Sequence, residues 1–370
     1  MNKAYKFRIY PNEKQIELIE KTFGCTRFIY NHFLDQRIEV YRSEGKSIGY
    51  TKQQNQLPKM KKEFEWLKEV DSTSLQMTLR NLDKAFKNFF RDKKAGFPKF
   101  KSKKNNKKTY SINYVNNNIE VKKNRIKLPK LKWVSAKVHR FVKGRLISAT
   151  ISKSATSKYY VSIITECERE PTPKKEDNIG IDLGLSHFAT FSNGEKIRNP
   201  KYLKNTLEKI AKEQRKLSKK QKFSNNWYKQ KYKISKLHEK VKNQRQDFLH
   251  KLTQRIVDEN QIIILEDLSV KNMMKNKKLS RDIADLGWYK FYSYLEYKSK
   301  WHNRIIHKID RWFPSSRTCS HCGYIAESMP LSVRKWDCPN CETKDIDRDI
   351  NASINILRQG LKEIKTHDVA

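Results

Sequence analysis

A short apolar stretch that contains a single carboxylate, residues 178–185 (NIGIDLGL), constrains the fold of this chain most. Its isoleucine and leucine residues alternate with Gly180, Asp182 and Gly184, the period-two pattern of a half-buried β-strand. The two glycines leave space beside the acid for a ligand or another backbone segment. An acid on such a strand loses hydration and needs a cation, a hydrogen-bond donor or water. The stretch therefore predicts a strand whose aspartate is either salt-bridged or functional.

A second strand pattern also ends in acidic residues. Residues 261–265 (QIIIL) form an apolar run of strand length, as in strands that are buried on both faces, and Glu266 and Asp267 follow directly. A carboxylate at the exit of a central strand lies where open α/β sheets bind ligands. An acid at this position could also belong to an ordinary surface loop.

Three further aspartates, Asp345, Asp347 and Asp349, precede an apolar helix whose pattern ends at Gly360. An aspartate that opens a helix often serves only as its N-cap. If one of these acids instead meets the two strand acids in space, the three carboxylates could hold two divalent metal ions and support phosphodiester hydrolysis. Oxygen ligands of this kind suit Mg²⁺.

Four cysteines form two closely spaced pairs, Cys319-x2-Cys322 and Cys338-x2-Cys341. Two such pairs supply the four thiolates of a tetrahedral zinc site, and a closed four-thiolate site leaves no position for a reacting water. We therefore expect one structural Zn²⁺, with a redox or iron–sulfur role as the alternative. His321 lies inside the first pair and is interpreted as a loop residue.

The charge of the chain indicates a polyanionic partner. Lysine and arginine number 80 against 40 acidic residues, a net charge of +40 spread over 370 residues. Nucleic acid is the first explanation, and a ribosomal-type binder or a chain kept soluble by charge are the alternatives. No apolar run is long enough to span a membrane or to form a signal peptide, which predicts an intracellular protein. Cys25 and Cys167 are interpreted as small buried apolar residues.

The N-terminal half alternates between strand and helix patterns. Residues 3–10 predict a strand, and residues 109–168 predict short strands with turn signals, which suggests a small β-barrel or sandwich. Residues 11 to about 100 carry helical patterns, the first closed by Gly24 and later ones over residues 52–70 and 72–93, and would be an insertion into the barrel. Residues 101–108 are interpreted as a basic linker. Most of the rings that interleave with lysines at the end of this region are expected in its core: Phe86, Phe89 and Phe90.

The C-terminal half contains further elements between its acidic motifs. Residues 192–194 (SNG) predict a hairpin turn. Residues 199–260 predict a lysine-rich helical region broken near residues 224–226, either a solvated helix pair or a pair that contacts nucleic acid beside a groove. Residues 285–303 predict one more amphipathic helix, and residues 304–310 a strand.

Several motifs together resemble one protein family. GIDLGL, LEDL and DRDINASINI, with CSHCG and CPNC between the last two, are similar to the RuvC-type nuclease domain of the TnpB family. These proteins are transposon-encoded, RNA-guided DNA endonucleases that resemble compact type V CRISPR effectors. The segments FRIYPNEKQ, FGCTRFIYN, AGFPKFK and WFPSSRTCSHCG are also similar to that family, so the resemblance covers most of the chain.

The resemblance implies roles for particular residues. The metal-binding triad of the family falls on Asp182, Glu266 and Asp349, which would hold two catalytic Mg²⁺ ions. Asp267 and Asp347 are neighbours without that role. The four paired cysteines match the zinc module of the family.

The resemblance also implies a multidomain α+β fold. Its parts would be a wedge-like β-barrel (1–10 and 109–170), a helical recognition lobe (11–108), an RNase H-like (RuvC) α/β nuclease domain (171–317 and 343–360), an inserted zinc ribbon that contacts target nucleic acid (318–342) and a tail (361–370).

The function implied is RNA-guided hydrolysis of target DNA. The partners would be a guide RNA from the end of the transposable element and double-stranded DNA that carries a short flanking motif, with no membrane involved. We expect a monomer in the ribonucleoprotein, in the cytoplasm and associated with the nucleoid. The alternatives are an RNA-guided DNA-binding regulator that does not cleave, and a transposase that performs strand transfer.

Overall fold

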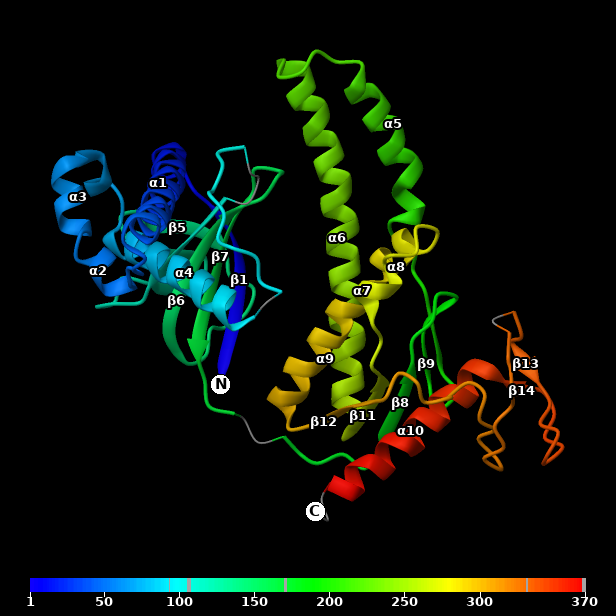
Figure 1. The fold of residues 1–370 in the computed structure, drawn as a ribbon. Coiled ribbons are helices and arrows are strands. Elements are labelled where there is room, and N and C mark those ends of the chain that lie inside the picture. The colour runs from blue at the N-terminus through cyan, green and yellow to red at the C-terminus, as the bar shows by residue number, and fades with distance from the viewer. Residues whose placement is uncertain (93, 105–107, 170–171, 331, 368–370) are drawn as a thin grey trace. The chain divides into compact units, whose positions relative to one another are not determined.

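The chain forms two compact units, Met1–Glu168 and Arg169–Ala370, in a computed structural model that describes residues 1–92, 94–104, 108–169, 172–330 and 332–367 (Figure 1). Each unit has its own sheet and its own apolar core. No helix in these ranges is long and apolar enough to cross a lipid bilayer.

The first unit is built on a seven-stranded sheet in the order β2-β6-β7-β1-β5-β4-β3, with every neighbouring pair antiparallel. The expected closed barrel is not found in the described residues, because β2 and β3 are the two edges of an open sheet. Ile19 and Phe23 of a helix join the apolar core of the sheet, so a helix covers surface that a barrel would cover with its own strands. The strands are β1 (Asn2–Tyr10), β2 (Lys108–Asn113), β3 (Glu120–Lys122), β4 (Arg125–Leu128), β5 (Lys132–Lys137), β6 (Arg145–Lys153) and β7 (Tyr159–Glu166).

The first helix, α1 (Glu13–Glu44), is longer than its sequence pattern indicates. Asn12 and Gln15 form a capping box at its start, and Gly45 ends it in the left-handed conformation (φ 65°). The predicted end at Gly24 is wrong, because buried residues continue on both sides of that glycine. Tertiary packing therefore outweighs the helix penalty of one glycine, about 1 kcal/mol.

The remaining helical region of the first unit agrees in part with its pattern. Residues 52–70 do not form one helix but are divided by turns, while α4 (Ser72–Arg91) is confirmed. Phe90 is 74% exposed, so its expected place in the core is wrong, and Cys167 is only half-buried. The short helices are α2 (Tyr50–Gln54), α3 (Leu57–Glu63) and the 3-10 helix η1 (Glu65–Lys68).

The second unit is built on a five-stranded sheet in the order β10-β9-β8-β11-β12. β8, β9 and β10 form an antiparallel meander with the predicted turn between the last two, whereas β8, β11 and β12 are parallel. The two acid-bearing strands are therefore adjacent and central, as their apolar patterns predict. The strands are β8 (Asn178–Asp182), β9 (His187–Phe191), β10 (Lys196–Arg198), β11 (Ile262–Glu266) and β12 (Ile305–Ile309).

Helices cover both faces of this sheet. One core joins Ile179, Ile181, Ile263 and Leu265 to residues of three helices, and a second core joins Ile264 to α10 on the other face. The helix predicted over residues 285–303 is divided at Gly287 (φ 71°). The elements are the 3-10 helix η2 (Lys204–Thr206), α5 (Leu207–Ser218), α6 (Asn225–Glu259), α7 (Val270–Met273), α8 (Ser280–Leu286), α9 (Trp288–His302), the strand pair β13 (Lys335–Trp336) and β14 (Ile346–Asp347), and α10 (Arg348–His367).

Two glycines let α10 lie directly on the sheet. A Cβ atom at Gly180 would lie 2.2 Å from the carbonyl oxygen of Ser353, so the backbone of α10 occupies the space that the bare face of β8 provides. A Cβ atom at Gly360 would lie 2.4 Å from the side chain of Ile264. Gly360 therefore does not end the helix as predicted, and its missing side chain instead permits close packing inside it.

These contacts predict opposite effects for two glycine substitutions. Gly180→Ala should destabilise the second unit by about 3 kcal/mol or more, because the added methyl group meets backbone. Gly24→Ala should stabilise the first unit by about 1 kcal/mol, because Gly24 is helical and has open space around it. Chemical denaturation of both variants measures the difference, and equal effects would contradict the proposed packing of α10.

Candidate functional site

Two strand ends and one helix start carry the three acids of the candidate site. Asp182 ends β8 and Glu266 ends β11. Because these strands are parallel neighbours, with Ile181 opposite Leu265, both carboxylates leave the sheet at the same edge. Asp349 lies in the first turn of α10, whose later residues pack on β8.

The surroundings of the two strand acids disfavour their charged forms. Burial raises the pKa of Asp182 from 3.8 to about 7, and repulsion from Glu266 and Asp349 adds to the rise, while Arg348 opposes it. Burial also raises the pKa of Glu266, against the hydrogen bond that its carboxylate accepts from the hydroxyl of Ser315. The negative charges of both other acids therefore contribute to the raised pKa of Asp182.

The two neighbouring acids have ordinary structural roles. Asp267 pairs with Lys308 at 3.2 Å and with Arg311, and the hydrogen bond from Lys308 is the main reason that its pKa is lowered. Asp347 binds Lys196 at 2.6 Å and accepts hydrogen bonds from the first amides of α10. Burial alone would raise the pKa of Asp347, but these contacts outweigh it. Asp267 is therefore a salt-bridged acid, and Asp347 is the acid that caps the helix.

Asp349 has a weaker partner than either neighbour. The guanidinium group of Arg334, which is 61% exposed, lies 3.7 Å from its carboxylate. Within the described ranges, the three acids do not form a group close enough to hold a metal ion, whereas the four paired cysteines do. The acids are thus electrostatically coupled rather than in contact.

Two asparagines of α10 hold the loop that orients Glu266, and sequence reasoning did not identify them. The side-chain amide of Asn355 donates to the carbonyl of Ser315 at 2.9 Å and to that of Thr318 at 2.6 Å. Asn351 donates to Thr318 at 2.7 Å and accepts from the amide of Ser320 at 2.8 Å. Both asparagines are nearly fully buried. Their spacing of four residues on an apolar helix face was the available signal.

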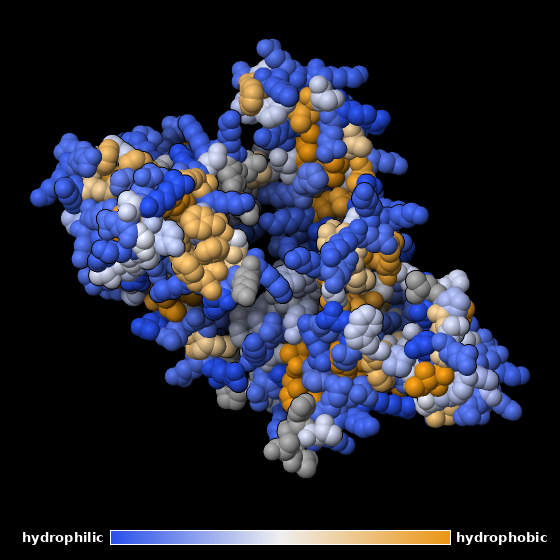
Figure 2. Space-filling view, viewed as in Figure 1, coloured by the Kyte–Doolittle hydropathy of each residue, from blue (hydrophilic) through white to orange (hydrophobic). Residues whose placement is uncertain are grey.

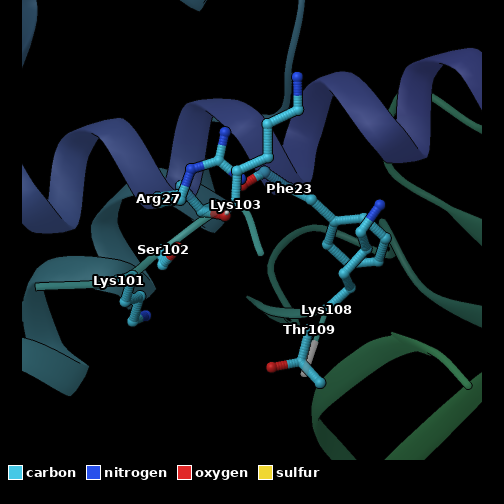
Figure 3. A pocket seen from close by; sticks show the side chains of 8 residues that line it. Phe23, Arg27, Lys101, Ser102, Lys103, Lys108 and Thr109 are labelled. Carbon is cyan, nitrogen blue, oxygen red and sulfur yellow. Dashed lines mark hydrogen bonds between the residues drawn. The ribbon is translucent and has the colours of Figure 1, made fainter. Parts of the chain in front are cut away.

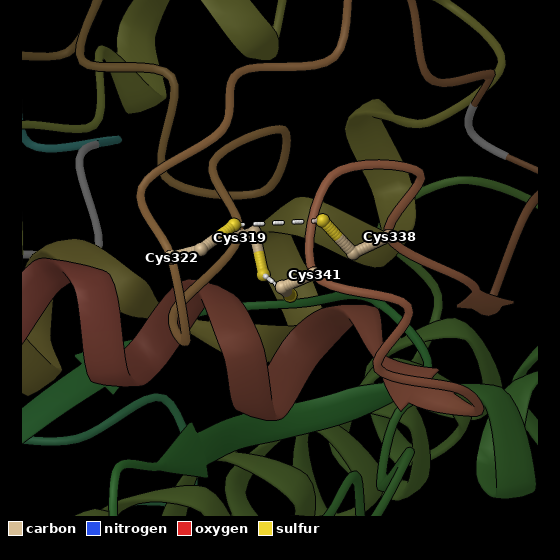
Figure 4. A group of neighbouring side chains, drawn as sticks. All are labelled: Cys319, Cys322, Cys338 and Cys341. Atoms are coloured by element: carbon tan, nitrogen blue, oxygen red, sulfur yellow. Dashed lines mark hydrogen bonds between the residues drawn. The ribbon is translucent and has the colours of Figure 1, made fainter.

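The four cysteines have the geometry of a tetrahedral metal site (Figure 4). Their sulfur atoms lie within 4.8 Å of one another, with Cys319 and Cys341 3.7 Å apart and Cys322 and Cys338 3.6 Å apart. Four thiolates around zinc are separated by about 3.8 Å, whereas disulfide sulfurs are about 2 Å apart. The arrangement therefore fits a four-thiolate metal centre.

The two cysteine pairs share one backbone structure. In the first, the amide of Cys319 donates to Tyr324 and Gly323 donates back to Cys319. In the second, the amide of Cys338 donates to the carbonyl of Thr343, and the amide of Glu342 donates to the carbonyl of Cys338. Gly323 (φ 80°) and Glu342 (φ 55°) are both left-handed. Burial raises the pKa of Cys319 to about 11, and the Thr343 hydroxyl and amide lower that of Cys341 to about 6.

A basic pocket lies between α1 and the segment that leads to β2 in the first unit. Its volume is about 280 Å³, and Figure 3 shows cationic and hydroxyl side chains around it. The ammonium group of Lys101 lies 4.0 Å from the ring centroid of Tyr30. The lining residues are Phe23, Thr26, Arg27, Lys101, Ser102, Lys103, Lys108 and Thr109. Such a lining suits phosphate groups.

The acid pair at the sheet edge predicts a stability cost. Asp182→Asn should stabilise the Mg²⁺-free protein at pH 8, because a pKa above the ordinary value means that stability is lost as pH rises from about 3.8 to about 7. The gain should approach about 4 kcal/mol at pH 8 and disappear near pH 4. Denaturation at both pH values measures it. If the stability change does not depend on pH, ionisation of Asp182 does not destabilise the folded protein.

Comparison with known proteins places the chain in a family. Protein-family models described as "Probable transposase", "Cas12f1-like, TNB domain" and "Helix-turn-helix domain" match residues 162–277, 288–356 and 1–46, respectively. A "Putative RNA-guided DNA endonuclease" of Streptomyces pristinaespiralis is 37% identical over 98% of this chain and 90% of the relative. "Putative RNA-guided DNA endonuclease InsQ" of Escherichia coli (strain K12) is 35% identical over 96% and 92%. The chain belongs to a family of transposon-associated proteins. This is the TnpB (IS605 OrfB) family.

A solved structure shows a more distant likeness. A chain of the "Cryo-EM structure of the Cas12f1-sgRNA-target DNA complex" is 18% identical and covers 96% of this chain and 99% of its own length, with a TM-score of 0.37. At that score the overlay is too loose to assign any part of this chain.

Proposed function

We propose that this protein is an RNA-guided DNA endonuclease that hydrolyses target DNA at Asp182, Glu266 and Asp349. The observation that carries the proposal is the electrostatic contrast among the acids of these motifs. Buried Asp182 and Glu266 have raised pKa values, whereas ion-paired Asp267 and Asp347 have lowered ones. Perturbed carboxylates at the ligand-binding edge of a sheet are typical of functional sites. The names of two relatives that span nearly the whole chain support the same activity.

The sheet of the second unit supports an RNase H-like (RuvC) assignment. It joins an antiparallel meander to two parallel strands that helices connect. The acids lie on β8 and β11, the first and fourth of its strands along the chain, and on its last helix, α10. We assign residues 171–317 and 343–360 to this nuclease domain. Residues 318–342 are assigned to an inserted zinc ribbon, and the four cysteines would hold its Zn²⁺.

The three carboxylates do not lie close enough together in this structure to hold one ion, so they would have to approach one another to hold two Mg²⁺ ions. Ions held in this way would stabilise the attacking and leaving oxygens of a phosphodiester. The other residues position these acids. Ser315 orients the carboxylate of Glu266, and Asp347 caps the helix that carries Asp349. Lys308 and Arg311 neutralise Asp267, which keeps that acid out of the site.

The charge of the chain supports nucleic-acid partners. A net charge of +40 and the basic pocket beside α1 suit phosphate backbones. We propose a guide RNA from the transposon end that reads the target sequence by base pairing, while the protein reads a short motif in flanking duplex DNA.

The test is a cleavage assay with the protein and its co-expressed RNA. Copurified RNA is sequenced, and matched DNA with randomised flanking sequence is added with Mg²⁺. We expect cleavage next to one flanking motif. Targeted binding without cleavage in Mg²⁺ or Mn²⁺ would instead identify a regulator, and joined products from labelled element ends would identify strand transfer.

A further inference from the structure

A helical hairpin of the second unit has an ordered base. Figure 1 shows α5 and α6 side by side, extending from the sheet to a short turn. Ile210 of α5 and Ile234 and Val241 of α6 are buried. Nearer the turn, the side-chain amide of Gln230 donates to the backbone carbonyl of Glu213 at 3.0 Å and to its carboxylate at 2.6 Å. The turn is therefore carried on a packed and hydrogen-bonded support.

Aromatic side chains gather near the turn of this hairpin, and three of them are exposed. Phe223 is 72% exposed, Tyr228 52% and Tyr232 38%. The ring of Trp227 lies 5.7 Å from that of Phe223 and 5.1 Å from that of Tyr228, between centroids. We call these four residues the aromatic tip. The rings of Phe223, Trp227 and Tyr228 form one contacting group, and Tyr232 lies about one turn further along α6.

The charged residues nearest the aromatic tip in the sequence are positive. No acidic residue lies between Gln214 and His238 in the sequence. The ammonium group of Lys231 lies 4.8 Å from the ring centroid of Trp227, and that of Lys236 lies 4.6 Å from that of Tyr232. Figure 2 shows mainly hydrophilic surface at this end of the hairpin. Other exposed lysines there are Lys219, Lys222, Lys229 and Lys233.

The backbone of the turn is strained at its most exposed ring. Phe223 has a φ of 68°, a left-handed conformation that bulky residues rarely adopt. Glycine or asparagine would occupy this position at lower cost. A ring that is neither buried nor suited to its backbone contributes little to folding. Strain of this kind is often associated with a binding role.

We propose that the aromatic tip binds unpaired nucleotides, whose bases stack on the rings while the surrounding lysines contact the phosphates. Exposed rings among cations form the stacking platforms of single-strand-binding proteins. Paired bases are already stacked and offer these rings no free face, so a duplex would engage the lysines alone. The chemistry is shared by unpaired guide RNA and by a displaced DNA strand, and the biological partner rests on the proposed function.

The test measures binding by the full-length protein without Mg²⁺. Fluorescent oligonucleotides of one length and mixed sequence are used as single-stranded RNA, single-stranded DNA and duplex DNA. The double variant Phe223→Asn and Tyr228→Ser removes two rings and leaves every lysine in place. The matched control is Tyr289→Ser on α9, because Tyr289 is 75% exposed in the same unit.

We expect the double variant to bind single strands at least tenfold more weakly and duplex DNA within twofold of the parent. The control should bind as the parent does. The ratio of the RNA and DNA losses shows which strand the tip holds. Phe223→Asn alone should keep or raise the melting temperature, which separates lost binding from lost folding.

Crosslinking provides a second, direct readout. Single strands that carry 5-iodouracil should crosslink to Phe223, Trp227 or Tyr228 of the unchanged protein. Unchanged single-strand affinity in the double variant, or equal losses for single strands and duplex, would overturn the proposal. The same measurements in an Asp182→Ala background separate this proposal from the nuclease proposal, because stacking needs neither metal nor cleavage.

Discussion

Asp182→Ala should abolish DNA cleavage while leaving RNA and target binding intact. The rate of single-turnover cleavage in Mg²⁺ should fall at least about a thousandfold, which corresponds to about 4 kcal/mol in the barrier. The reason is that Asp182 ends the central strand of the sheet and interacts with both other acids. Binding should survive because a carboxylate does not attract phosphate, and its loss removes repulsion.

The sharpest control is an acid of the same motifs with a different environment. Asp267 directly follows Glu266, yet it is paired with Lys308 and Arg311. Asp267→Ala should therefore retain cleavage within about tenfold, with some loss of stability. Asp349→Ala and Asp347→Ala form a second pair, in which only the first should abolish cleavage. An Asp182→Ala protein that cuts at the parent rate would remove Asp182 from the mechanism.

The strands that carry Asp182 and Glu266 were predictable because their signals are local. A short apolar run of strand length that ends in acids, such as residues 262–265, indicates a buried strand. Gly180 also predicted a close approach, and the structure identifies the approaching segment as the backbone of α10. The sequence could not show this, because Ser353 is far away along the chain.

The errors have non-local causes. Gly24 and Gly360 both carry the signal of a helix end, but packing on each side continues the helix. The sequence patterns of the first unit indicated β-strands, but they could not show that α1 covers the sheet and that the sheet stays open. Tertiary contacts decide such cases, and local propensity does not register them.

The assignment of individual acids depends most on distant partners. Asp347 is neutralised by Lys196, and Asp267 by Lys308 and Arg311. Spacing alone left Asp345, Asp347 and Asp349 equivalent. Only the fold distinguishes an acid that meets a lysine from one that faces other acids.

Removal of zinc should unfold the segment that carries the four paired cysteines, residues 318–347, here called the cysteine module. The rest of the second unit should stay folded. The small core of this module consists of Cys319, Cys338 and Ile346, with Trp336 and Cys341 packed against it. Three of these five side chains are proposed metal ligands, and the strands among its described residues are the two-residue pair β13 and β14. Such a core is too small to fold alone, and structural zinc contributes about 10 kcal/mol or more in comparable peptides.

Cys338→Ser should therefore lower the zinc content from one equivalent and remove amide-exchange protection from residues 318–347, while β8 and β11 stay protected. Cys167→Ser is the control, because this cysteine lies in the other unit and hydrogen-bonds to Lys143. Cleavage should also fall, since Ser320 of the first pair is bound to Asn351 of α10 and the module supplies Arg334 beside Asp349. Unchanged metal content and unchanged exchange in Cys338→Ser would show that the four thiols do not hold a structural metal.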